Sequence, residues 1–193
     1  MSEPDDAKLF LTARHEGAHV TAAWAVGDTV TSARFRSKKW RARGKLGKMS
    51  HTHNPELAAF ACSQIRGDGP CCCERIKTAK YIVIAIAGLI VDHAAGALHL
   101  EGSDAENILR WANELSGGGV EERNQLILDL GRIAKDILER WPSAINLIAL
   151  GIVRDKVLRQ KQIHGWLGEP LWPWFFTNQI AAVIKAAPTS STH

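Results

Sequence analysis

Apolar residues follow helical spacing over most of the chain and change to strand-like patterning in two short stretches near its N-terminal end. The pattern predicts helices over residues 5–26, 54–65, 72–98, 121–141 and 142–167. Residues 29–36 are β-branched and partly alternating, and residues 46–52 form a second short run, so we expect two strands. Ser103-Asp104-Ala105-Glu106 matches a capping box, which predicts that another helix begins at Ser103 and ends at glycines 117–119. The expected fold class is therefore mainly α (α+β), with a small β-sheet.

The length and composition favour one folded domain. The chain has 193 residues, of which 46% are hydrophobic and 23% charged, and these values exclude collagen, a coiled-coil rod and wholesale disorder. We assign residues 1–167 to a single domain. Residues 168–193 form a Trp-rich C-terminal extension with a polar end, which we expect to dock over the core.

Three features predict a cytoplasmic protein without a membrane span. The acidic, polar N-terminus does not resemble a signal peptide. The longest apolar run, residues 81–91, falls well short of the ~20 residues that a span requires. Three of the four cysteines are consecutive, at positions 71–73, an arrangement poorly suited to a disulfide framework and more typical of reduced thiols.

The positive charge is concentrated in one segment. The formal charge is +4, but residues 34–48 hold eight basic residues and no acidic one, so the rest of the chain carries −4. A solvated loop is the commonest meaning of such a run. Contact with a substrate or partner is the next interpretation, ahead of nucleic-acid binding in which Trp40 would stack between bases. The candidate contact residues are Arg34, Arg36, Lys38, Lys39, Arg41 and Arg43.

The first predicted helix contains the pattern HExxH, from His15 to His19. Histidines four residues apart lie on one helical face, so both imidazoles can reach one tetrahedral Zn²⁺ ion. Glu16 lies beside that face and can take a proton from zinc-bound water. A catalytic zinc needs a third protein ligand, and Ala22 and Ala25 exclude the metzincin arrangement. Candidates elsewhere are several glutamates and His51, His53, His93, His99, Asp92 and Asp104; of these, we expect His51 and His53 to be exposed polar residues.

Several segments resemble the peptidase domain of FtsH-type (AAA+ protease) zinc metallopeptidases. These are residues 13–24, with HExxH in an Ala-rich helix; the apolar helix 84–96; the Gly-Ser-Asp segment 101–107; and the C-terminal region 139–167. The resemblance covers residues 7–167 and implies a zincin-like helical fold with a C-terminal helical hairpin. It also implies the zinc ligands His15, His19 and Asp104, with Glu16 as general base. Asp92 and His93 replace the acidic pair of the family, so Asp92 could orient a ligand histidine and His93 could be an alternative ligand.

The resemblance implies a zinc metalloendopeptidase with one Zn²⁺ per chain. No P-loop motif and no membrane span accompany the peptidase segments, so we expect a standalone domain that cuts flexible or unfolded polypeptides. A homo-oligomer and a separate ATPase partner both remain open. The alternative is a zinc-containing pseudo-peptidase or binding module that contacts a protein or nucleic acid through the basic loop 34–48.

Overall fold

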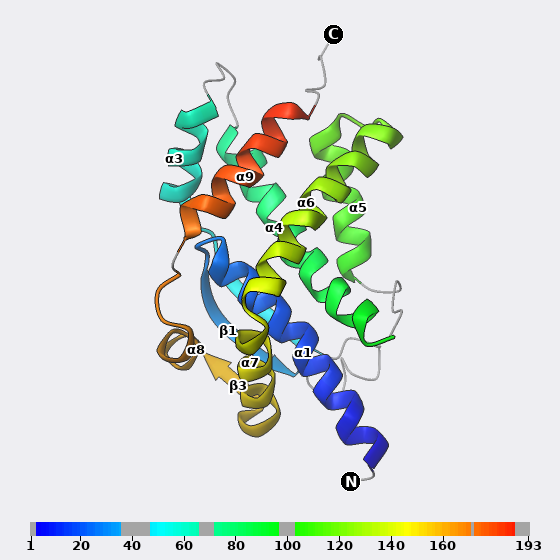
Figure 1. Ribbon diagram of the computed structural model, residues 1–193, viewed down its shortest axis with the longest axis vertical. Coiled ribbons are helices and arrows are strands. Elements are labelled where there is room, and N and C mark those ends of the chain that lie inside the picture. The colour runs from blue at the N-terminus through cyan, green and yellow to red at the C-terminus, as the bar shows by residue number, and fades with distance from the viewer. Residues whose placement is uncertain (1–2, 36–46, 66–71, 97–102, 171, 188–193) are drawn as a thin grey trace.

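The computed structural model describes residues 3–35, 47–65, 72–96, 103–170 and 172–187, and within these ranges the protein is mainly helical with one small antiparallel sheet (Figure 1). This architecture confirms the expected mainly α fold with a small sheet. The elements, in chain order, are α1 (Glu3–Ala25), β1 (Thr29–Phe35), β2 (Gly47–Thr52), α3 (Pro55–Ile65), α4 (Cys72–Ala94), α5 (Ser103–Ser116), α6 (Val120–Arg140), α7 (Pro142–Asp155), β3 (Val157–Arg159), α8 (Gln160–Leu167) and α9 (Pro173–Ala186).

Helix α1 is the centre of the packing, between α4 and α7. Its second half is buried on all sides because it is built largely from small residues, including Ala18, Ala22 and Ala23. At Gly17 a β-carbon would lie 2.6 Å from the carbonyl oxygen of Ile145 in α7. The close approach of α7 therefore requires glycine at this position, two residues after His15.

The three strands form a sheet with the order β2-β1-β3, in which each neighbouring pair is antiparallel. Gly47 pairs with Phe35 at one end of β2, and Thr52 pairs with Thr29 at the other. In the described part of the chain, β2 is thus an edge strand. Since β1 follows α1 after a short turn at Gly27, the sheet packs along α1.

The prediction of one helix over residues 142–167 is wrong. Helix α7 ends at Asp155, because Lys156 adopts a left-handed conformation (φ 63°) that a continuing helix does not allow. The next residues form β3, which pairs with β1, and α8 follows. The segment expected to form the C-terminal helical hairpin, residues 139–167, holds two helices, α7 and α8, which are separated by β3 and contact each other, while α7 packs mainly against α1 (Figure 1).

The Trp-rich extension contributes α9 to the core. Phe176, Ile180 and Ile184 are buried, and the helix packs against α3, α4 and α6 (Figure 1). The expected docking over the core is confirmed for residues 173–186. Among the described residues, no helix is both long and apolar enough to cross a membrane.

Candidate metal centre

Helices α1 and α5 bring three potential metal ligands together. His15 and His19 lie one turn apart on α1, and Asp104 lies in the first turn of α5. Asp104 Oδ2 is 3.2 Å from His15 Nε2 and 3.3 Å from His19 Nε2, while the two Nε2 atoms are 2.8 Å apart. Ligand atoms in a tetrahedral zinc site are about 3.3 Å apart. The three ligand atoms form a group that could hold a metal ion.

Helix α4 orients both histidine rings through the nitrogen atoms that face away from this centre. His19 Nδ1–H donates to the carbonyl oxygen of Ile84 at 2.7 Å, and His15 Nδ1 lies 2.8 Å from Asp92 Oδ2. A carbonyl oxygen can only accept, so the proton of neutral His19 is on Nδ1 and Nε2 is available as a ligand. The carboxylate of Asp92 has the same effect on His15.

Gly88 makes room for the two rings on the surface of α4. A β-carbon at this position would lie 2.5 Å from His19 Cε1 and 2.7 Å from His15 Cε1. Any side chain would push the imidazoles away from their present positions, so the close packing of α4 on the ligand helix depends on this glycine.

The electrostatics of the cluster favour a positive charge between the three side chains. Burial alone would lower the pKa of His15, but the carboxylates of Asp104 and Asp92 outweigh it and raise the pKa to about 10. Burial would raise the pKa of Asp104, yet its hydrogen bonds from His15 and His19 hold that pKa well below the usual range. Without metal, a proton on His15 supplies the positive charge, and a bound cation would displace that proton.

Glu16 is buried next to the ligand face and lies against the first residue of β2. A β-carbon on Gly47 would overlap the Glu16 carboxylate, so the main chain of β2 passes this side chain at a distance that only glycine permits. The edge strand therefore begins at the candidate base.

The structure groups five of the predicted site residues and separates the others. His15, Glu16, His19, Asp92 and Asp104 lie together. His93 is exposed and is not among the described residues whose ligand atoms converge. Arg34 is exposed on β1, whereas Arg36, Lys38, Lys39, Arg41 and Arg43 lie outside the described residues.

Gly88, Gly47 and the carbonyl group of Ile84 were not predicted as parts of the site. A glycine within the apolar helix 72–98 was a signal for close packing at Gly88. Nothing in the sequence marks the Ile84 carbonyl or the approach of Gly47 to Glu16, because both depend on tertiary contacts.

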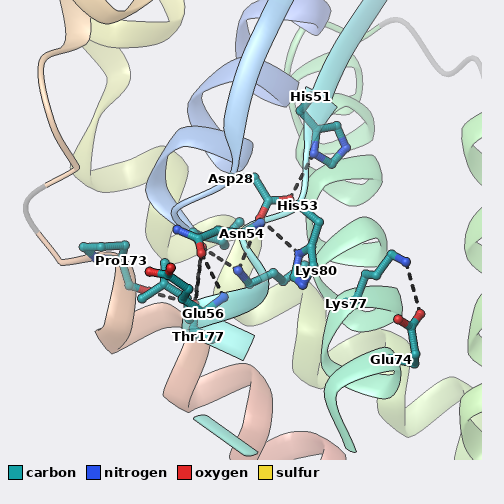
Figure 2. Close-up of polar contacts among 12 residues, drawn as sticks. Asp28, His51, His53, Asn54, Glu56, Glu74, Lys77, Lys80, Pro173 and Thr177 are labelled. Carbon is teal, nitrogen blue, oxygen red and sulfur yellow. Dashed lines mark hydrogen bonds and ion pairs between the residues drawn. The ribbon is translucent and has the colours of Figure 1, made fainter. Parts of the chain in front are cut away.

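A second cluster surrounds Asp28, at the end of α1 (Figure 2). The carboxylate of Asp28 is fully buried and lies 3.0 Å from His51 Nδ1, 3.3 Å from His53 Nδ1 and 3.2 Å from Lys80 Nζ. The Lys80 ammonium also donates to the carbonyl oxygen of Val26 at 2.8 Å. The side chains of His51 and His53 are only 16% and 12% exposed, so the expectation of two exposed polar residues is wrong.

The pKa shifts in this second cluster follow from burial around one carboxylate. Burial lowers the pKa of Lys80 and of His53, and only partial compensation comes from Asp28. Burial would raise the pKa of Asp28, but His51 and Lys80 outweigh it and lower that pKa. Asp28 is thus a buried anion whose charge is balanced by the buried ammonium group of Lys80. Its contacts connect the end of α1 with β2 and α4.

No family model matches the chain, and neither the curated proteins nor the solved structures include a match.

Proposed function

We propose that the protein is a zinc metalloendopeptidase of the zincin type, with one Zn²⁺ per chain held by His15, His19 and Asp104. The observation that carries the proposal is the convergence of these three ligand atoms within 4.8 Å of one another, beside the buried carboxylate of Glu16. A bound zinc would supply a Lewis acid that lowers the pKa of a coordinated water and polarises a carbonyl group.

The chain's own residues would perform the proton transfers. Glu16 would accept a proton from the attacking water and pass it to the amine that leaves when the peptide bond breaks. Asp92 and the Ile84 carbonyl would keep the ligand rings in one tautomer during this cycle. Burial of Glu16 and the close main chain at Gly47 leave the Glu16 carboxylate little room to move.

The substrate we propose is a flexible or unfolded polypeptide. β2 is an edge strand in the described part of the chain and begins at Glu16, so an extended segment could add to the sheet beside the scissile bond. A segment inside a folded protein could not reach this edge unless that protein first unfolded. For folded substrates, a separate ATPase partner would drive the unfolding.

The proposal is tested by zinc content together with peptide hydrolysis. We expect near-stoichiometric zinc in purified protein supplemented with zinc, and cleavage of an unfolded protein such as reduced casein. Glu16→Gln should lower kcat by about 10²- to 10⁴-fold, the usual contribution of general base catalysis, and leave zinc bound. Glu139→Gln, on an exposed face of α6, is the matched control and should retain full activity.

Two results would contradict the proposal. The first is the absence of zinc binding at neutral pH even after zinc addition. The second is full activity of Glu16→Gln. Stoichiometric zinc binding in a chain that hydrolyses no unfolded substrate would instead favour a pseudo-peptidase that binds a partner.

A further inference from the structure

Three partly exposed aromatic rings form a continuous series on different elements. The His51 ring of β2 meets the Tyr81 ring of α4 edge-on, with centroids 5.2 Å apart. Tyr81 in turn lies 5.8 Å from the Trp111 ring of α5. Each of the three residues is only partly buried, so the series remains partly accessible to solvent. We call His51, Tyr81 and Trp111 the aromatic patch.

Helices α4 and α5 and strand β2 each connect the candidate metal centre with the aromatic patch. Tyr81 is seven residues before Gly88 on α4, and Trp111 is seven residues after Asp104 on α5; each separation is about 10 Å of helix. His51 is four residues after Gly47 on β2, which is about 13 Å of strand. The patch therefore lies three to four residues of extended polypeptide from the centre, along the direction in which β2 runs.

The ring of His51 is fixed by the Asp28 cluster (Figure 2). Its Nδ1 atom lies 3.0 Å from the buried carboxylate of Asp28, which is itself held by Lys80. Trp111 packs against the hydrophobic core, which restrains its side chain. A preformed aromatic surface loses little conformational entropy when it binds a ligand, so the patch is suited to recognition.

We propose that the aromatic patch is a specificity subsite that binds an aromatic or large apolar side chain of the polypeptide substrate, three or four residues from the cleaved bond. The inference rests on the proposed function for the position of that bond. The occupant is an extended polypeptide because the patch is continuous with β2, whose edge begins at the candidate base. Aromatic pairing and burial of the side chain would then add to the main-chain hydrogen bonds of β-augmentation.

The test uses zinc-loaded full-length protein and a set of labelled, otherwise polar peptides. Each peptide carries a single Phe or, in its partner, a single Ala, placed three or four residues before or after a common cleavable bond. For one placement we expect kcat/KM to be about 10-fold higher with Phe than with Ala, corresponding to one well-buried aromatic contact. Trp111→Ala should reduce this ratio to below about 3. Trp174→Ala removes an exposed tryptophan of α9 and should keep the wild-type ratio.

Peptide binding by the aromatic patch can be measured independently of hydrolysis. Fluorescence anisotropy with Glu16→Gln gives the affinities for the same peptides without turnover, and the Phe preference and its loss in Glu16→Gln/Trp111→Ala should reappear. If the wild type cleaves nothing but this binding preference is present, the proposed function fails and the subsite stands. Equal affinities for Phe and Ala peptides, or an unchanged ratio in the Trp111 variant, would overturn the subsite. If Trp111→Ala does not fold, as judged by circular dichroism, Tyr81→Leu takes its place in both measurements.

Discussion

The protein contains two clusters built from the same side chains, two histidines and a central aspartate, and they differ in the source of positive charge. Around Asp28, the ammonium group of Lys80 lies 3.2 Å from the carboxylate, so the charge is balanced within the chain. Around Asp104, no lysine or arginine contact is found among the described residues, and only a proton on His15 balances the charge.

Lys80 makes the Asp28 cluster unsuitable for a metal ion, and the Asp104 cluster has no such lysine among the described residues. Lys80 would repel a cation at Asp28, and it keeps that carboxylate occupied. At Asp104, by contrast, the histidine nitrogens converge with the carboxylate, and within the described ranges the site's positive charge comes from a proton that zinc can displace. The same residue types therefore give a structural junction in one place and a candidate metal centre in the other.

The largest expected difference is in stability after loss of the aspartate charge. Asp28→Asn leaves Lys80 as an unpaired buried charge, so it should lower the free energy of unfolding by about 3–5 kcal/mol. Asp104→Asn, measured with a chelator present, should lower the free energy of unfolding by less than Asp28→Asn does, because its charge partner His15 keeps Asp92 and can release its proton, and it should abolish zinc binding. Urea unfolding and zinc titration of both variants test this contrast. Equal stability losses in the two variants would contradict the different roles.

The double variant Asp28→Asn/Lys80→Met is the control for that explanation. Because it removes both charges, it should recover a large part of the stability lost in Asp28→Asn, whereas an unrelated packing defect would not be repaired by a second substitution.

The two glycines near the centre should separate metal binding from catalysis. Gly88→Ala forces the ligand rings to move, so we expect zinc affinity to fall about 10- to 100-fold, as for other groups that orient metal ligands. At Gly47 the nearest atoms to an added β-carbon belong to the Glu16 side chain, so Gly47→Ala should lower kcat by about 10- to 100-fold while zinc affinity changes less than about twofold. A competitive zinc chelator and steady-state hydrolysis measure the two effects.

Gly165→Ala on α8 is the matched control, because nothing lies within 4 Å of the β-carbon that it adds. It should leave both zinc affinity and kcat at wild-type values. A loss of zinc affinity in Gly47→Ala as large as that in Gly88→Ala would show that β2 positions the ligands rather than the base.

Much of the fold could be predicted because it follows from local signals. Periodicity and capping residues located α1, α3, α5 and α6 to within two residues at each end. They failed over residues 142–167, where β3 has only three residues and the left-handed turn at Lys156 lacks the usual glycine. Short strands that depend on a distant partner leave almost no periodic signal.

The candidate site was predictable in part for a similar reason. His15, Glu16 and His19 follow from spacing on one helix, whereas Asp104 is distinguished from any other acid at a helix N-terminus only by the resemblance to a family. The Asp28 cluster has no sequence signature, because its members come from a turn, a strand end and a distant helix. Such clusters are defined by tertiary packing alone.

The smallest expected effect is the pH dependence of the Asp28 cluster. The pKa of His53 is lowered in the folded protein, so the unfolded chain binds a proton more readily, and stability falls as pH drops below about 6.5. The raised pKa of His15 acts in the opposite direction in metal-free protein, with stability falling as pH rises from about 6.5 towards 10.

The two contributions can be separated by comparing wild type with His53→Gln in chelator. The His15 contribution is the same in both proteins and cancels, so their stability difference isolates His53. We expect the wild type to lose more stability than the variant between pH 7.5 and pH 5, by less than about 1 kcal/mol because His53 is only partly buried and the attraction of Asp28 offsets part of the effect of burial. A larger loss in His53→Gln would mean that protonated His53 strengthens the contact with Asp28, and that the Asp28 cluster, like the Asp104 cluster, favours additional positive charge.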